Sequence, residues 1–460
     1  MSSQADLAPE LLSELAALLG DRVSTAAIVR EHHGKDTTFH PSHPPQAVVF
    51  PESSDEVCRL VQACTRHRAP IIPYGAGTSA EGHISALHGG VTVDMSRMNR
   101  VLRVSPEDLD VTVEAGVTRK QLNRFLHDTG LFFPIDPGAD ASLGGMAATR
   151  ASGTNAVRYG TMKENVLSAA VVLPSGQLIR SARRARKSAA GYDLTSLFVG
   201  SAGTLGIITE VTLRLYGIPE EIAAGVCSFP SLAAAVATTI GLIQAGVPIA
   251  RVELMDELSM RALNAHAKLG LSVAPTLIFE LHGTRSAVAE QAALVTAFAG
   301  EHGGDAIAWQ TRQEERNRLW QARHDVYFAL LAQRPGSEGW PTDVCVPVSR
   351  LADCIDETLS DLRSCSLPVA ILGHVGDGNF HLLFAVDPSK SAELAEAKDF
   401  NDRLIRRAIS MDGTCTGEHG IGYAKLDYME LEHGGAVAVM SAVKNSIDPL
   451  GLLNPGKVIG

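Results

Sequence analysis

Several features that would assign this chain of 460 residues to a common class are missing from its sequence. It has seven cysteines, an odd number, and no Cys-x-x-Cys pair, which suits a reducing cytosol better than a disulfide scaffold. Basic residues are not in excess, because 40 Lys and Arg stand against 51 Asp and Glu, a net charge of −11. That balance argues against general binding to nucleic acid or anionic membranes. We expect a cytoplasmic protein, and leave open a peripheral association with the inner membrane.

Signals for export or membrane insertion are also missing. Residues 1–20 have no basic n-region, so we expect an amphipathic helix there rather than a signal peptide. Residues 231–250 are nearly free of charge and long enough to be considered as a membrane span. They are rich in Ala and contain Thr, Gln and Pro248, so we predict a buried helix and no membrane span. The one basic cluster, residues 180–187, is expected to be a solvated loop.

What the first half does contain is three loops rich in Gly, Ser and Thr. A strand–helix–strand pattern over residues 47–72 leads into the first loop, and the other two cover residues 134–160 and 200–206. The first loop has neither the GxGxxG spacing of a Rossmann turn nor the lysine of a P-loop. Glycines let backbone amides approach a phosphate without obstruction by Cβ. We therefore predict a long ligand wrapped by backbone, with ordinary surface loops as the alternative.

The second half contains a segment that predicts a hairpin with two histidines. Residues 370–384 read AILGHVGDGNFHLLF, and an Asp-Gly pair between apolar runs is typical of a two-residue type I′ turn. With Asp377 and Gly378 at the tip, His374 faces His381 on one side of the sheet. Their Cβ atoms would lie roughly 4.5–5.5 Å apart. The pair is either a metal site or two ordinary histidines near a turn.

A third metal ligand is offered by the segment GTCTGEHGIGYAK at residues 413–425. Glu418 and His419 are adjacent there and lie between glycines. His374, His381 and Glu418 make a His₂–carboxylate set, which suits Zn²⁺ or Mn²⁺ with an open coordination position. Such a metal could serve structure or catalysis.

The three Gly-rich loops resemble a known flavoprotein family when they are taken as a set. PYGAGTSAEG, DPGADASLGGMAATRASGTNAVRYGTMKENVLSAAVVLPSG and GSAGTLGIITEVTLRL are similar to the FAD-binding domain of the vanillyl-alcohol-oxidase type. Within that superfamily the chain resembles cytochrome- or acceptor-linked D-lactate dehydrogenases, the glycolate oxidase D-subunit and D-2-hydroxyglutarate dehydrogenase. The resemblance implies an α+β fold with a two-part FAD-binding domain and an α+β cap domain with an antiparallel sheet. We expect an FAD domain at residues 1–218, a cap at 219–410 and a C-terminal segment, 411–460, that completes the active site.

The resemblance also assigns roles to individual residues. It implies FAD contacts from the three loops and from the closing LNPGK segment, which are Pro73, Tyr74, Gly75, Ala76, Gly77, Thr78, Ser79, Gly82, Pro137, Gly138, Ser142, Gly144, Gly145, Ser152, Gly153, Gly206, Ile208 and Asn454. Arg323, which ends an LWxxR pattern, would bind a substrate carboxylate, with a structural ion pair as the alternative. His419 would take the hydroxyl proton as general base. The resemblance favours catalytic use of the metal.

The implied activity is FAD-dependent oxidation of a D-2-hydroxy acid to a 2-oxo acid. The residues after Arg323 are mostly apolar, which favours a monocarboxylate such as D-lactate. There is no cysteine pattern for an iron–sulfur cluster, so we expect an external acceptor such as a quinone, a cytochrome or an electron-transfer flavoprotein. A metallohydrolase using the three metal ligands and a non-catalytic FAD subunit are the competing hypotheses. The oligomeric state, including a homodimer, is left open.

Overall fold

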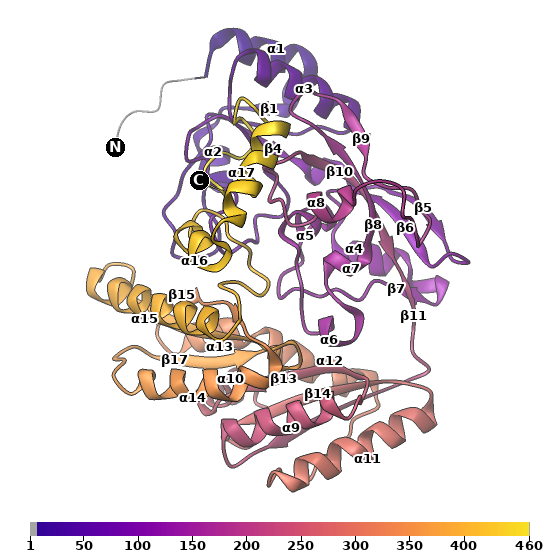
Figure 1. The fold of residues 1–460 in the computed structure, drawn as a ribbon, viewed down its shortest axis with the longest axis vertical. Coiled ribbons are helices and arrows are strands. Elements are labelled where there is room, and N and C mark those ends of the chain that lie inside the picture. Colours follow the sequence, from indigo (N-terminus) through magenta and orange to yellow (C-terminus); the bar gives the residue numbers. More distant parts are fainter. Residues whose placement is uncertain (1–6, 460) are drawn as a thin grey trace. The chain divides into compact units, whose positions relative to one another are not determined.

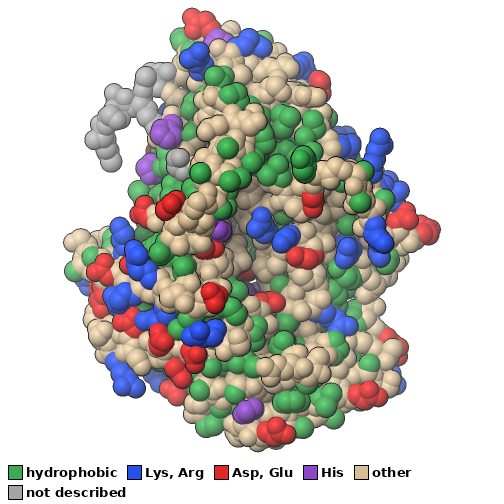
Figure 2. All heavy atoms as spheres, viewed as in Figure 1, with side chains coloured by type: hydrophobic (Ala, Val, Ile, Leu, Met, Phe, Trp, Pro, Cys, Tyr) green, Lys and Arg blue, Asp and Glu red, His purple; other side chains and the backbone are tan. Residues whose placement is uncertain are grey.

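The computed structural model describes residues 7–459, which form two compact units (Figure 1). Within that range, the first unit consists of residues 7–152, 160–218 and 418–459, and the second of Gly153–Tyr159 and Pro219–Gly417. No helix among the described residues has both the length and the apolar character needed to cross a bilayer. On the face seen in Figure 2, basic and acidic side chains are interspersed rather than gathered by sign.

The first sheet of the first unit is largely parallel. Its strands, in the order β1-β2-β4-β3, are β1 (Val23–Ser24), β2 (Ala47–Val49), β4 (Val91–Asp94) and β3 (Ile71–Tyr74). Strands β2 and β3 flank β4 in parallel, as the expected strand–helix–strand pattern requires. Between them runs α3 (Ser54–Arg66), which begins where Ser53 accepts a hydrogen bond from the Glu56 amide. Its apolar face packs with α1 (Pro9–Leu19) into a buried core.

The second sheet of this unit is antiparallel, and the third Gly-rich loop leads directly into its central strand. Its strands, in spatial order, are β5 (Val101–Ser105), β6 (Asp110–Glu114), β10 (Ile207–Arg214), β8 (Val166–Val172) and β9 (Leu178–Arg180). A small sheet pairs β7 (Leu131–Phe132) with β11 (Tyr216–Gly217). The remaining helices of the unit are α2 (Ala27–Gly34), α4 (Arg119–Phe125), α5 (Leu143–Thr149), α7 (Met162–Asn165), α8 (Leu194–Phe198), α16 (Met429–His433) and α17 (Ala436–Ile447).

The C-terminal segment returns to the first sheet. Leu453 forms a parallel bridge with Ile71, whose amide donates to the Leu452 carbonyl at 2.8 Å. The Asn454 amide in turn donates to the Ile71 carbonyl at 2.8 Å. These bonds place the end of the chain beside β3, just before the first Gly-rich loop begins.

The second unit is built on one large antiparallel sheet with helices. The strands follow the order β12-β14-β13-β17-β18-β15, and β16 also pairs with β18. They are β12 (Glu221–Ser228), β14 (Thr276–Gly283), β13 (Ile249–Met255), β17 (Val369–Gly373), β18 (Asn379–Val386), β15 (Glu338–Pro341) and β16 (Val344–Cys345). The helices are α6 (Ala156–Tyr159), α9 (Leu232–Gln244), α10 (Glu257–Ala267), α11 (Arg285–Glu301), α12 (Gln313–His324), α13 (Val326–Ala332), α14 (Leu351–Leu362) and α15 (Ser391–Ser410).

One apolar core fixes the position of α12, which carries Arg323. Side chains of α10, α12 and α13 pack there against strands β13, β14, β17 and β18. Within residues 231–250 the predicted helix is present as α9, from Leu232 to Gln244, and it buries Leu232, Val236 and Leu242. The sheet therefore holds the histidine strand and the arginine helix in one body.

Candidate functional site

The first Gly-rich loop follows β3 and approaches neighbouring side chains too closely to carry a Cβ at its glycines. A Cβ at Gly75 would lie 2.2 Å from Oγ of Ser142, in the second loop. Gly77 and Gly82 have φ angles of +67° and +71°, and a Cβ at Gly82 would lie 2.1 Å from the Tyr423 ring. The sequence therefore needs glycine here on both steric and conformational grounds. Such a loop can present its amides to a phosphate.

The second and third loops contain most of the other expected cofactor positions. Ser142 begins α5, its Oγ accepting from the Gly145 amide at 3.4 Å. A Cβ at Gly144 would lie 2.4 Å from Cβ of Ala115, and one at Gly206 would lie 2.4 Å from Cγ1 of Val171. Further expected positions in or beside the loops are Pro137, Gly138, Ser152, Gly153 and Ile208. Their individual contacts with a cofactor stay predictions.

Buried polar atoms without partners mark this part of the first unit as a ligand site. Oγ of Ser79, Nδ1 of His83, Oγ of Ser201 and the hydroxyl of Tyr423 have no hydrogen-bond partner in the structure. An unsatisfied buried polar group costs about 1–3 kcal/mol, so several together are typical of a site that a ligand completes. Ser79 belongs to the first Gly-rich loop and Ser201 to the third. The residues present therefore fit an elongated polar ligand such as FAD.

Asn454 ties two of these loops together. Its side-chain amide donates to the carbonyl of His83 at 3.1 Å and to the carbonyl of Ala202 at 2.8 Å. The residue is buried and adopts a φ of +41°. Its side chain thus connects the first and third loops. Its contact with the isoalloxazine stays a prediction.

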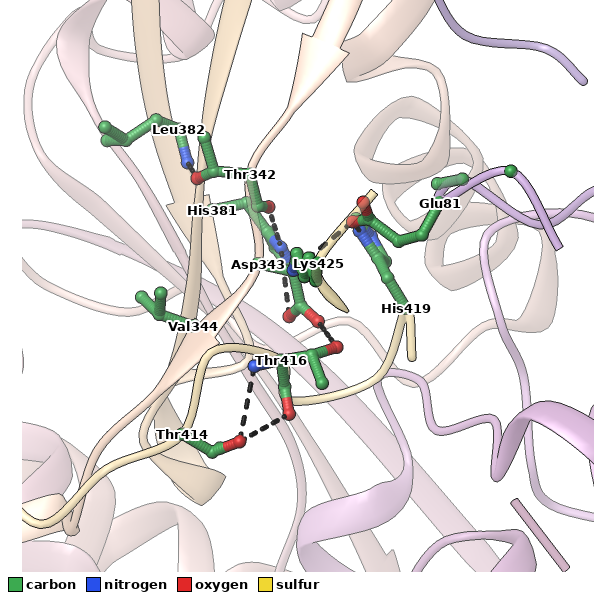
Figure 3. Close-up of polar contacts among 12 residues, drawn as sticks. Glu81, Thr342, Asp343, Val344, His381, Leu382, Thr414, Thr416, His419 and Lys425 are labelled. Atoms are coloured by element: carbon green, nitrogen blue, oxygen red, sulfur yellow. Dashed lines mark hydrogen bonds and ion pairs between the residues drawn. The ribbon is translucent and has the colours of Figure 1, made fainter. Parts of the chain in front are cut away.

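The segment after Gly417 places His419 beside a buried carboxylate. Figure 3 shows Glu81, from the first Gly-rich loop, pointing toward His419 and Lys425. Glu81 Oε1 lies 3.3 Å from His419 Nδ1 and 3.2 Å from Lys425 Nζ. Burial raises the pKa of Glu81, but Lys425 and His419 outweigh burial, and the net pKa lies below its usual range. The carboxylate is therefore ionised next to the proposed base.

The predicted hairpin exists in the second unit, but its predicted register is wrong. Leu372, not His374, is the partner of His381, and five residues, 374–378, connect β17 to β18. A type I′ turn needs two consecutive positive φ angles, and of Asp377 and Gly378 only Gly378, at +79°, has one. His374 therefore lies in the connection, directly after β17, and not on a strand. The two imidazole rings still meet, with centroids 5.5 Å apart.

Both histidines are oriented by an acceptor at Nδ1. His374 Nδ1 lies 2.7 Å from Oε1 of Glu253, and His381 Nδ1 lies 2.9 Å from the Thr342 carbonyl. A carboxylate and a carbonyl only accept, so each imidazole donates from Nδ1 and carries its lone pair on Nε2. Metal-binding histidines are held in this way by their surroundings. In each ring Nε2 is therefore the nitrogen that a cation would bind.

Glu253 joins His374 to Arg323. It lies on β13, is fully buried, and accepts from Arg323 Nη2 at 2.7 Å and Nε at 3.0 Å. Burial raises its pKa, but the interactions with His374 and Arg323 outweigh burial and lower it overall. The Nε–Nη2 side of the guanidinium thus faces Glu253. Arg323 therefore makes the ion pair that was the structural alternative, and only its Nη1 end lies away from this carboxylate.

Asp343 fixes the end of the second unit, next to Glu418. It is fully buried and accepts from Asn379 Nδ2 at 2.8 Å. It also accepts from Thr416 Oγ1 at 2.6 Å (Figure 3). A Cβ at Gly417 would lie 2.2 Å from the same Asn379 nitrogen. The backbone that leads into Glu418 is consequently held tightly.

Comparison with family models decides the family. Residues 218–458 match the model described as FAD linked oxidases, C-terminal domain, and residues 45–182 match the FAD binding domain. The chain belongs to the FAD-linked oxidase family. The FAD-binding prediction is thereby confirmed at the level of the family.

Curated relatives of this FAD-linked oxidase match nearly its whole length. The probable mitochondrial D-lactate dehydrogenase of Danio rerio is 52% identical, over 98% of this chain and 91% of the relative. The mitochondrial D-lactate dehydrogenase [cytochrome] of Arabidopsis thaliana is 46% identical, over 98% of this chain and 80% of the relative. Glycolate oxidase subunit GlcD of Bacillus subtilis is 33% identical, over 90% and 89%. The family resemblance seen in the sequence is confirmed.

Solved structures share the fold. The 4-ethylphenol oxidase of Gulosibacter chungangensis has a TM-score of 0.81 at 18% identity, covering 97% of this chain and 96% of that one. p-Cresol methylhydroxylase has a TM-score of 0.79 at 18% identity, with the same coverage. At such identities the likeness concerns the fold alone. It confirms the α+β fold with an FAD-binding domain of the vanillyl-alcohol-oxidase type.

The expected cytoplasmic location is contradicted by the relatives. Both D-lactate dehydrogenases named above are mitochondrial. The expectation rested on an odd number of cysteines without a Cys-x-x-Cys pair. That pattern indicates reducing conditions but does not distinguish between the compartments that provide them.

The sequence did not single out Glu81, Glu253, Asp343 or Lys425. Glu253 had the clearest signal, a carboxylate within the strand IARVELM, whose other residues apart from Arg251 are apolar. A charged residue on a buried strand needs a partner, which marks it as a candidate site residue. Glu81 and Lys425 lie among glycines, where no periodicity reveals burial. Their contacts appear only in the folded chain.

Proposed function

We propose that this FAD-linked oxidase oxidises D-lactate to the 2-oxo acid and passes the electrons to an external cytochrome. The observation that carries the proposal is the identity of 46–52%, over 98% of the chain, with enzymes named D-lactate dehydrogenases. The relative from Arabidopsis thaliana is named for its cytochrome acceptor. A dehydrogenase for glycolate is the second candidate, supported by the 33% identity with glycolate oxidase subunit GlcD.

FAD would be held by the first unit. The Gly-rich loop at residues 73–79 would bind the pyrophosphate through its amides, and the loops around Ser142 and Gly206 would enclose the rest. The unpartnered Ser79 and Ser201 hydroxyls support this placement. When bound, FAD supplies the acceptor for the hydride of the substrate.

A divalent cation, Zn²⁺ or Mn²⁺, would be bound by His374, His381 and Glu418. These side chains offer two imidazole nitrogens and a carboxylate oxygen, a donor set that suits either metal. The Nδ1 contacts with Glu253 and Thr342 support this assignment because they direct Nε2 of both rings to serve as ligands. The cation would lower the pKa of the substrate hydroxyl.

His419 and Arg323 would act on the substrate itself. With Nδ1 of His419 directed at Glu81, Nε2 is the nitrogen that would accept the proton of the hydroxyl. Arg323 would bind the carboxylate through its Nη1 end, because Glu253 holds the Nε–Nη2 side. The side chains of α13, which follows Arg323 in the chain, are mostly apolar and include no basic residue that could bind a second carboxylate.

The test is a set of anaerobic titrations of the purified, FAD-containing protein with D-lactate, L-lactate, glycolate and D-2-hydroxyglutarate. D-lactate should bleach the flavin absorbance fastest, L-lactate should not, and NAD⁺ should not reoxidise the reduced protein. Removal of metal by a chelator should slow the bleaching, and Zn²⁺ or Mn²⁺ should restore it. Protein without flavin, or flavin that no hydroxy acid reduces, would contradict the proposal. Indifference to the chelator would remove the metal alone.

A further inference from the structure

Glu81 is the point at which the segment carrying His419 is attached to the first Gly-rich loop. Its main-chain carbonyl accepts from the amides of Tyr423 and Ala424, at 3.1 and 3.4 Å. Gly422, with a φ of +52°, passes so close that a Cβ would lie 1.8 Å from this carbonyl oxygen. The backbone of Glu81 therefore attaches the segment to the loop, and the amide of Val458 adds a bond to the Gly422 carbonyl at 3.0 Å. The Glu81 side chain is not needed for that attachment.

The side chain of Glu81 has different partners. The residue is 6% exposed, and Oε1 lies 3.3 Å from Nδ1 of His419 and 3.2 Å from Nζ of Lys425 (Figure 3). Lys425 is also buried, at 2% exposure. Two buried charges at this distance neutralise each other, so Lys425 stabilises the anion without removing its ability to accept a hydrogen bond.

We propose that Glu81 is the positioning residue for His419, fixing the tautomer in which Nδ1 carries the proton and Nε2 the lone pair. The inference rests on the proposed function, in which His419 takes the hydroxyl proton. A carboxylate at Nδ1 orients the imidazole and stabilises the imidazolium that forms, which is the role of the aspartate in serine-protease triads. Lys425 belongs to this arrangement because it holds Glu81 as the anion. The step is a proton transfer, in which the proton leaves the substrate hydroxyl and binds Nε2 of His419. It requires no further reactant.

A double-mutant cycle tests the coupling in the full-length, FAD-loaded protein. The variants are Glu81→Gln, His419→Ala and both together, with Glu114→Gln as the matched control. Glu114 is likewise buried and paired with a cation, Arg100 at 2.7 Å, and lies in the same unit. The measurements are flavin content, the limiting rate of anaerobic flavin reduction by D-lactate, and the D-lactate concentration for half-maximal rate.

Glu81→Gln should lower the limiting rate on the order of 10²-fold, the lower bound of a general base's contribution, with little change in the half-saturating concentration. Glu114→Gln should leave the rate unchanged. In the His419→Ala background, Glu81→Gln should add less than about a factor of two, because residues acting as a unit are not additive. If Glu81 had a merely structural role, Glu81→Gln would instead lower the limiting rate by the same factor with and without the His419 side chain.

Two results would overturn the inference while the proposed function stands: a normal rate for Glu81→Gln, or an additive loss in the double variant. Normal reduction of flavin in His419→Ala would instead exclude His419 as the base, which is a failure of the proposed function. If Glu81→Gln does not retain FAD, Glu81→Asp replaces it in the cycle. Glu81→Asp keeps the negative charge but moves it away from Nδ1 of His419. Its effects on the rate alone and combined with His419→Ala are then compared in the same way.

Discussion

His83 is a buried imidazole that the protein keeps neutral. It is 5% exposed and its Nδ1 has no hydrogen-bond partner. Burial lowers its pKa to about 4, and the lowering outweighs the opposing effect of Glu81. An unfolded chain would protonate this side chain near its ordinary pKa of about 6.5. Between these two pKa values the unfolded state binds a proton at this side chain that the folded state does not bind. The free energy of unfolding therefore falls as the pH falls.

We therefore predict that His83→Gln flattens the pH dependence of stability. In the wild type, the free energy of unfolding should fall by up to about 3 kcal/mol between pH 6.5 and pH 4 on account of His83. The variant should lose that component, because it has no proton to take up. Urea unfolding at several pH values measures the slope. His127→Gln, which removes an exposed imidazole of the same unit, is the control and should keep the wild-type slope. An equal slope in His83→Gln would contradict the prediction.

At the scale of elements, the sequence indicated the hairpin but not its register. The apolar runs around Asp377 and Gly378 predicted two strands and a reversal, and both are present as β17 and β18. The turn type was wrong because tertiary contacts decide it. The Gly378 carbonyl accepts from the Val346 amide at 3.1 Å, next to β16. No local pattern in residues 370–384 reveals that third segment.

The candidate site depends even more than the hairpin on tertiary contacts that the local sequence does not reveal. Residue types and spacing identified His374, His381 and His419, because chemistry-bearing side chains stand out among glycines and apolar residues. Their orienting partners are distant in the chain: Glu253 lies 121 positions from His374, and Glu81 lies 338 from His419. Pairs of this kind depend on the topology of a whole unit. A single sequence can therefore indicate which side chains are candidates for binding or catalysis. It does not indicate the distant residues that orient those side chains.

The loop of the hairpin gives a prediction at this scale. Gly378→Ala should destabilise the second unit, because its φ is +79° and a Cβ would lie 2.0 Å from the Val346 carbonyl oxygen. The backbone conformation alone costs about 1–2 kcal/mol, and displacing β16 adds to this cost. Gly336→Ala is the matched control, since Gly336 has a φ of +85° and open space around its Cβ position. Urea unfolding should show a loss for Gly378→Ala larger than that for Gly336→Ala by about 1 kcal/mol or more. Equal losses would mean that the contact with Val346 relaxes freely.

At the scale of the whole molecule, charge is the property that composition reports directly. The chain carries −11 overall, with 51 acidic residues. The visible face in Figure 2 intersperses both signs rather than presenting one large patch. A net charge of this size acts on partners at distances beyond contact, within the screening length of about 8–10 Å at physiological salt. It therefore bears on the proposed electron acceptor more than on the fold.

An acidic dehydrogenase should transfer electrons faster to a basic cytochrome than to a neutral acceptor of the same potential. After reduction by D-lactate, its second-order rate with a basic c-type cytochrome should fall on the order of tenfold as salt rises from about 10 to 200 mM, because screening removes the attraction. The rate with an uncharged quinone analogue, measured by the same stopped-flow mixing, should change little and serves as the control. A cytochrome rate that is indifferent to salt, or that rises with it, would show that the net charge does not steer this encounter. The acceptor would then have to be recognised by a local surface, with contacts that hold at high ionic strength.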